Sequence, residues 1–202
     1  MRTTGDTRQR IVAAATELFR RQGYAATGMK QIVSEAGAPY GSAYHFFPGG
    51  KGQLGEEVIR TSGAAYLELI GTLFADPGAD PAAATAAAFT GAAETLRELD
   101  FTDPCPIATV ALEVASTHEA LRRATADVFA SWIEALAAFY AAAGIAADTA
   151  RDTAGSVIAL LEGAFMLARA AHDTAPVLAA AHASAAIVRE ALGSAGQCRA
   201  AP

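Results

Sequence analysis

The sequence predicts an all-α protein, and three observations lead to this prediction. The chain has 202 residues, of which 52% are hydrophobic and 53 are alanine, a residue that loses no side-chain entropy on entering a helix. Apolar side chains recur at helical spacing, and no strand-like alternation appears. Clusters of glycine and proline divide the chain into segments of helical length. We therefore expect three short helices followed by a larger helical domain.

The first helix is expected to begin at Asp6, as an N-cap residue, and to end at Gln22. Gln9 stands three residues after Asp6 and completes a capping box, and Gly23 provides a stop. One face of this helix carries the apolar positions Ile11, Ala15, Leu18 and Phe19.

Two shorter helices follow at the spacing of a helix-turn-helix motif. Thr27 is a candidate cap for the second helix and Gly37 a candidate stop, while the third helix is expected to begin near Pro39 and to end before Pro48. The turn between them has three or four residues. The apolar positions of the second helix are Met29, Ile32, Val33 and Ala36.

The rest of the chain is expected to form long helices. A connecting helix is predicted for residues 51–75, and breaks are predicted at 76–81 and 103–106, where proline, glycine and aspartate gather. The chain is expected to leave the helical state after Gly193. The other predicted helices span residues 82–99, 107–115, 118–142, 148–171 and 175–192.

The sequence lacks the features of membrane-spanning, secreted and disulfide-rich proteins. No stretch without Asp, Glu, Lys or Arg is longer than that from Thr174 to Val188, which is shorter than a membrane span of ~20 residues, so we expect no transmembrane helix. The N-terminus has no uninterrupted apolar segment and does not resemble a secretion signal. Two cysteines, Cys105 and Cys198, form neither a disulfide framework nor a metal cluster. A soluble cytoplasmic protein without metal or cofactor is therefore expected.

Charge is distributed unevenly along the chain, whose formal net charge is −6. Residues 1–51 carry seven Lys/Arg and three Asp/Glu, a balance of +4, whereas residues 52–202 carry eight against eighteen, a balance of −10. A basic head on an acidic body is what a reader of double-stranded DNA with a separate sensing domain needs. We therefore predict a DNA-binding domain at 1–51 and a second domain at 52–202.

The third helix is the expected DNA-reading element. Tyrosine hydroxyls and an imidazole N–H can donate to phosphate oxygens, a lysine can reach a phosphate, and a glycine lets the backbone approach a base. Base reading is then left to Tyr40, Gly41 and Ser42. The predicted DNA-binding residues are Lys30, Tyr40, Gly41, Ser42, Tyr44, His45 and Lys51.

Residues 8–56 resemble the N-terminal domain of TetR/AcrR-family transcriptional regulators, in particular the LmrA/YxaF-like branch. The resemblance is carried by RQRIVAAATELFRRQGYAATGMKQIVSEAGAPYGSAYHFFPGGKGQL, which contains the pattern AP-x-GS-x-YH-x-FPGGK, and by the later segment CPIATVALEVA. It implies that Tyr44, His45 and Lys51 hold phosphates and that Lys30 is another common contact. It also implies that Tyr40 and Ser42 face the bases.

Three positions depart from this pattern. Tyr40 stands where the branch commonly has Lys or Arg, and Phe46 where it often has a second histidine, so fewer cationic contacts are expected. Ala43 replaces a usual core leucine. If the site does not repack, this replacement costs roughly 2–5 kcal/mol in the anchoring of the third helix.

The second domain is expected to hold a small-molecule effector. Large aromatic side chains among many alanines leave space between helices, although the same side chains also suit an ordinary core. The resemblance implies an amphipathic or aromatic effector. The predicted pocket residues are Phe89, Glu113, Phe129, Trp132, Leu136 and Phe165.

The last two long helices are expected to form a homodimer interface. Small residues at Gly155, Ala159 and Gly163 and apolar residues on other sides indicate a helix buried on both flanks. The resemblance implies dimerisation through these helices, and the alternative is an alanine-rich monomeric core.

These features together predict a homodimeric regulator of transcription, released from a palindromic operator by its effector. One alternative is a dimeric DNA-binding protein that has no effector. A second is an all-helical enzyme that uses Cys105 as a reactive thiol near a helix N-terminus. The four histidines show no paired metal-ligand spacing, so no metal site is expected.

Overall fold

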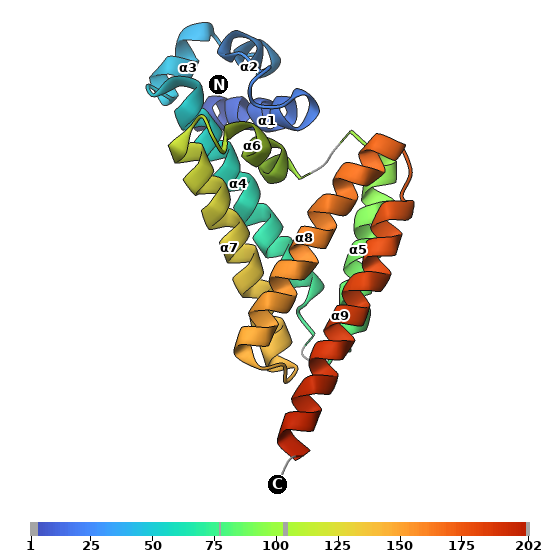
Figure 1. Cartoon of the computed structure of the whole chain (residues 1–202). Coiled ribbons are helices and arrows are strands. Elements are labelled where there is room, and N and C mark those ends of the chain that lie inside the picture. Colours follow the sequence, from blue (N-terminus) through green and yellow to red (C-terminus); the bar gives the residue numbers. More distant parts are fainter. Residues whose placement is uncertain (1–3, 77, 103–104, 201–202) are drawn as a thin grey trace. The chain divides into compact units, whose positions relative to one another are not determined.

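The computed structural model describes residues 4–76, 78–102 and 105–200, with side chains for residues 6–76, 78–102 and 105–194. These residues form nine α-helices and no strands (Figure 1), which confirms the all-α prediction. The helices are α1 (Thr4–Gln22), α2 (Met29–Glu35), α3 (Tyr40–Phe46), α4 (Gly50–Leu73), α5 (Pro81–Glu98), α6 (Pro106–Val114), α7 (Glu119–Ala142), α8 (Ala147–Ala171) and α9 (Ala175–Ala200).

Two predicted helix starts are wrong. Helix α1 begins at Thr4, so Asp6 lies in its first turn and not at its cap. The N-cap of α2 is Gly28, and no side chain caps that helix. The Thr27 hydroxyl instead donates to the carbonyl oxygen of Gly23 at 2.7 Å, and the Gln22 amide donates to the same hydroxyl.

Helix α3 begins at Tyr40 with Pro39 as its N-cap, close to the predicted start. One further boundary differs from the prediction. Helix α9 continues to Ala200, so the predicted loss of helix after Gly193 is wrong. Alanine and serine around this glycine keep the helical propensity high enough for continuation. The side chain of Cys198 lies outside the described residues.

The chain divides into two compact units. One comprises the described residues up to Ala65 together with Cys105–Phe129, and the other comprises the remaining described residues. Helix α6 therefore belongs with α1, α2 and α3, although some sixty residues separate it from α3 in the sequence. The predicted boundary at residue 51 stays a prediction.

The core of the first unit contains the apolar positions expected from the sequence. Ile11, Ala15 and Phe19 of α1 are fully buried, as are Ile32 of α2 and Phe47 after α3. Helices α4 and α7 meet closely, because a Cβ built on Gly63 would lie 2.5 Å from a methyl carbon of Val128. This close approach holds the first part of α4 against α7.

The core of the second unit is formed by α5, α8 and α9 with the end of α7. Helix α9 packs against both α5 and α8 (Figure 1). One polar contact lies inside this core, where the hydroxyl groups of Thr85 and Tyr140 are 2.8 Å apart. The Thr85 hydroxyl also donates to the carbonyl oxygen of Pro81 at 2.7 Å.

Replacing Tyr140 with phenylalanine should remove a loss of stability at alkaline pH. Burial raises the pKa of Tyr140 to about 12, although its hydrogen bond with Thr85 acts in the opposite direction. The unfolded chain ionises this hydroxyl near pH 10 and the folded chain does not, so stability is complete below pH 10 and falls up to pH 12. Urea unfolding should show a wild-type loss of about 2 kcal/mol over this range that Tyr140→Phe lacks. Equal losses in both proteins would contradict the assignment.

Helix α8 is the one described helix that is long and apolar enough to cross a membrane by length and composition. The sequence predicted no such helix, because that prediction used the length of charge-free stretches, whereas α8 meets a criterion of mean hydropathy that allows a few charged residues. Core helices of soluble proteins pass the same test, so this finding is weak evidence for insertion. Of the most apolar 18-residue segment of this helix, 22% is buried within the chain.

Candidate nucleic-acid interface

The turn between α2 and α3 is held by a side chain from α1. Gly37 has a φ of +55°, a backbone conformation that glycine adopts without strain, and it ends α2 as predicted. Arg10 donates from Nη1 to the carbonyl oxygens of Ala36 at 2.6 Å and of Gly37 at 3.2 Å. Charged donors form strong hydrogen bonds with such free carbonyls. Helix α1 thereby fixes the angle at which the chain enters α3.

Helix α3 has one buried side and one exposed side. Ala43 within α3 and Phe47 after it are fully buried, whereas Tyr40 and Tyr44 are 52% and 48% exposed. Gly41 is exposed as well, and a Cβ added there would meet nothing within 4 Å. Three of the predicted DNA-binding residues, Tyr40, Gly41 and Tyr44, thus lie on the exposed side. The exposed face is therefore free to receive a ligand along its length.

The two exposed tyrosines form a pair. Their ring centroids are 5.6 Å apart in an edge-to-face arrangement, and their hydroxyl oxygens are 3.4 Å apart. The hydrogen bond with Tyr40 is the largest cause that raises the pKa of Tyr44 above its ordinary value. The Tyr44 hydroxyl is therefore neutral at physiological pH, and phenolic hydroxyls of this kind can donate hydrogen bonds to DNA oxygens.

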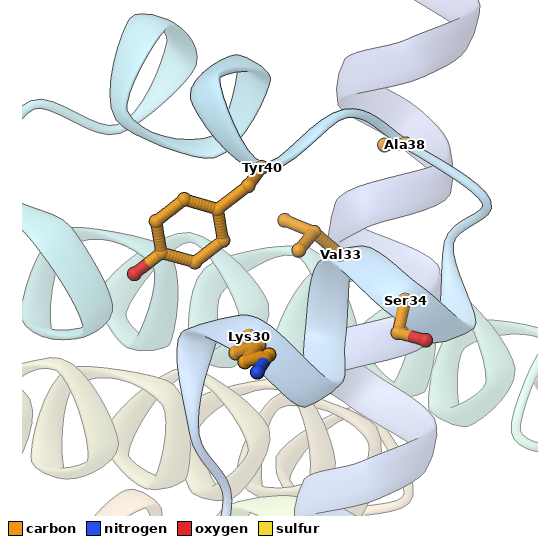
Figure 2. Close-up of a pocket in the computed structure, with 5 residues that line it drawn as sticks. All are labelled: Lys30, Val33, Ser34, Ala38 and Tyr40. Carbon is orange, nitrogen blue, oxygen red and sulfur yellow. The ribbon is translucent and has the colours of Figure 1, made fainter.

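A pocket of about 350 Å³ lies between α2 and the start of α3. Figure 2 shows three of its residues on α2, Ala38 on the turn that follows, and Tyr40 at the start of α3, with the Tyr40 ring next to the methyl groups of Val33. The lining residues are Lys30, Val33, Ser34, Ala38 and Tyr40.

The two lysines predicted to contact phosphates differ in their surroundings. Lys30 is exposed and makes no hydrogen bond or ion pair within the described part of the chain. Lys51, in the first turn of α4, donates to the carbonyl oxygen of Tyr24 at 3.0 Å, and its Nζ lies 4.3 Å from the centroid of that ring. Lys51 therefore braces the loop between α1 and α2 in addition to offering a positive charge.

The structure brings six of the seven predicted DNA-binding residues together on α2 and α3. These residues are Lys30, Tyr40, Gly41, Ser42, Tyr44 and His45. Five of them are exposed and Ser42 is half-buried. The seventh, Lys51, lies one short turn after α3. Their contacts with DNA stay a prediction.

The predicted effector residues are divided between the two units. Phe89 and Leu136 share the core of the second unit, and Phe165 packs against that core. Trp132 is buried beside the ring of Tyr66, with the two centroids 5.5 Å apart. Phe129 and Glu113 belong to the first unit. The role of these six residues in effector binding stays a prediction.

Glu113 contacts the loop between α1 and α2. Its Oε2 atom accepts a hydrogen bond from the backbone N–H of Ala25 at 2.6 Å, and its carboxylate occupies the space where a Cβ on Gly23 would lie. Gly23 also has a φ of +85°, so a larger residue is disfavoured there twice. Neither this contact nor that of Arg10 was predictable from the sequence, because no local pattern links residues so far apart.

Two family models match the chain. The model described as "Bacterial regulatory proteins, tetR family" matches residues 11–58, which include α2 and α3. The model described as "Transcriptional regulator LmrA/YxaF-like, C-terminal domain" matches residues 81–183. The two matches lie at the segments on which the resemblance in the sequence was based.

Two relatives from Bacillus subtilis cover most of the chain. The HTH-type transcriptional regulator YxaF is 34% identical over 94% of this chain and 99% of its own length. The HTH-type transcriptional regulator LmrA is 32% identical over 86% of this chain and 92% of its own length. Both are named as transcriptional regulators, so the enzymatic alternative built on Cys105 is discarded. The structure places Cys105 in the core.

Solved structures share the fold. The regulatory protein TetR from Rhodobacter sphaeroides has a TM-score of 0.80 at 22% identity and covers 89% of this chain and 97% of its own. A TetR transcriptional regulator from Chloroflexus aurantiacus has a TM-score of 0.76 at 27% identity and covers 94% and 98%, respectively. The arrangement of an N-terminal helix-turn-helix followed by long helices is therefore common to these proteins.

Proposed function

Because this chain belongs to the TetR family of DNA-binding transcriptional regulators, we propose that it is a homodimeric, cytoplasmic repressor released from its operator by a small molecule. The operator is a nearly palindromic stretch of double-stranded DNA. Two copies of α3 enter successive major grooves, ~34–36 Å apart. No cofactor takes part in this scheme.

The observation that carries the proposal is the exposed face of α3. A recognition helix needs a buried side that fixes its position and a polar side that is free to enter the groove. Ala43 and Phe47 supply the first, and the tyrosine pair with Gly41 supplies the second. Arg10 adds rigidity to the turn before α3. These features support direct DNA reading by this helix.

Dimerisation through α8 and α9 is supported by apolar surface that the single chain leaves uncovered. Met166 and Leu167 on α8 are 61% and 58% exposed, and Leu178 on α9 is also exposed. Gly155 and Gly163 of α8 have open space at the position of a Cβ. Small residues let a helix of a second copy approach closely, and two-fold pairing is the commonest assembly. Sedimentation should give twice the mass of one chain.

The effector is proposed to be a small amphipathic or aromatic molecule held in the second unit. Aromatic side chains such as Phe89 and Phe165 lie there among alanines, in a bundle where ligands are accommodated between helices. An effector that prefers a conformation of the dimer with low DNA affinity will weaken DNA binding. DNA must then weaken effector binding by the same factor. This reciprocity distinguishes a sensor from a dimer without effector. Thermal shift against a library of such molecules tests for stabilisation.

The direct test is binding of the purified protein to DNA upstream of its own gene and of the neighbouring genes. Fluorescence anisotropy should show tight binding to one such fragment that weakens steeply as salt increases. A scrambled duplex of equal length and composition serves as the control. Equal affinity for both duplexes, or no binding to either, would contradict sequence-specific regulation.

Replacing Lys51 with alanine should weaken binding to all DNA sequences. The change removes one phosphate-neutralising charge, so the slope of log K against log salt should fall by about one unit. Arg60→Ala on the same helix is the matched control, because Arg60 is paired with Glu56 at 2.9 Å and should leave the slope unchanged. Since Lys51 also binds the carbonyl of Tyr24, unfolding is measured in parallel. An unchanged slope in Lys51→Ala would exclude the phosphate contact.

A further inference from the structure

The pocket between α2 and α3 lies where a recognition helix meets base edges. In helix-turn-helix proteins the first residues of this helix contact the bases in the major groove. Tyr40 is the first residue of α3, is half exposed, and forms one wall of the pocket. Val33 and Ala38 form the opposite side (Figure 2). The pocket therefore opens on the same face as the tyrosine pair.

The walls of this pocket are mainly apolar. The Val33 methyls, the Ala38 methyl and the Tyr40 ring supply carbon surface, whereas Lys30 and Ser34 supply one ammonium and one hydroxyl. Lys30 has no partner among the described residues, so its ammonium is available for a phosphate of the DNA backbone. A DNA strand that places a phosphate near Lys30 and an apolar group of a base against the apolar walls would fit this pocket.

The edges of the four base pairs differ in what they offer to such a pocket. Guanine is read by the paired donors of Arg or Lys, adenine by Asn or Gln, and cytosine by a carboxylate, whereas thymine presents its C5 methyl group. No carboxylate or carboxamide is among the residues that line the pocket. Lys30 is the one lining cation and is directed to a backbone phosphate in this scheme, so a guanine or adenine edge would place its N7 acceptor against Val33 and the Tyr40 ring, whereas thymine presents a methyl group in the major groove. Thymine is the base whose major-groove edge matches these walls.

We propose that this pocket receives the C5 methyl group of a thymine in each half-site, with Tyr40 and Val33 as its walls. The proposal rests on the proposed DNA binding and adds to it the base that this position reads. Lys30 binds the neighbouring phosphate and does not distinguish the base. The pocket of about 350 Å³ is larger than a methyl group, so the edge of the base enters with it.

The test compares thymine with uracil, which pairs identically and lacks only the methyl group. An operator is first selected from a random-sequence duplex library with the full-length protein, and each thymine is then replaced singly by deoxyuridine. Burial of one methyl group is worth ~0.8 kcal/mol, so one position in each half-site should lose affinity about fourfold. Replacement in both half-sites should lose about fifteenfold. The other thymines should change affinity by less than twofold.

Variants of the protein assign the effect to the pocket. Tyr40→Ala removes an exposed wall and should abolish the difference between thymine and uracil at that position, whereas Tyr40→Phe keeps the ring and should keep the difference. Lys30→Ala should weaken binding to both duplexes equally and leave their ratio at about four. Val33 is left unchanged because it is also part of the core.

The outcomes separate this inference from the function on which it rests. Tight, sequence-specific binding without any uracil-sensitive position overturns the thymine pocket and leaves the regulator intact. A uracil effect that persists in Tyr40→Ala assigns the methyl group to another part of the protein and overturns the pocket as well. Failure to select any DNA sequence overturns both proposals.

Discussion

Phe47→Ala is expected to lower the free energy of unfolding by about 4 kcal/mol and to abolish specific DNA binding. Phe47 is fully buried directly after α3, and the guanidinium of Arg8 lies 5.3 Å from the centroid of its ring. Helix α3 has seven residues, too few to persist without packing. Loss of this ring therefore leaves a cavity and releases the C-terminal end of α3. Urea unfolding and anisotropy with the selected operator measure the two effects.

The matched control is Tyr44→Ala, which removes an aromatic ring from the opposite side of the same helix. Tyr44 is 48% exposed and packs only edge-to-face on the equally exposed Tyr40, so its loss should change stability by no more than about 1 kcal/mol. DNA affinity should nevertheless fall. Similar losses of stability in the two variants would show that α3 is not divided into a core side and a DNA side.

Gly63→Val is expected to destabilise the first unit by about 3 kcal/mol. A Cβ at Gly63 would lie 2.5 Å and 2.7 Å from the two methyl carbons of Val128, and these methyls belong to a stiff β-branched side chain. Either α4 and α7 must separate or Val128 must leave its preferred rotamer. Thermal unfolding should show a lower midpoint, with the helical content at low temperature retained.

Gly71→Val on the same helix is the control for helix propensity. A Cβ at Gly71 meets nothing within 4 Å, so this substitution should be neutral or slightly stabilising. A second variant, Gly63→Val with Val128→Ala, makes room for the new side chain and should recover at least half of the loss. Equal behaviour of Gly63→Val and Gly71→Val would exclude the close contact.

The helices of the N-terminal helix-turn-helix motif were predictable because short-range rules decide most of their ends. Gly23 and Gly37 stop helices where a positive φ is needed, and the buried positions of α1 and α2 follow the helical period. The cap at Thr27 failed because its hydroxyl bonds to the preceding turn instead of the following helix. Local patterns indicate a polar residue at such a boundary but not which of two neighbouring turns it stabilises.

Contacts between distant segments were not predictable in the same way. Glu113 stands beside an apolar run in the sequence, which is equally compatible with a ligand pocket, a helix cap or a surface. Its contact with Ala25 spans 88 residues and depends on how α6 packs against α1. The pocket between α2 and α3 was not predictable either, because its polar and apolar lining residues follow no regular spacing in the sequence.

The association of α6 with α1 has a practical consequence for engineering chimeric regulators. Ile107, Val110 and Val114 of α6 are buried, and Glu113 holds the loop that leads to α2. Transplanting the N-terminal segment alone onto a foreign sensory module would strip α1 of this covering and expose its apolar flank to solvent. A graft that preserves operator recognition should therefore carry the segment 105–129 along with the first 65 residues.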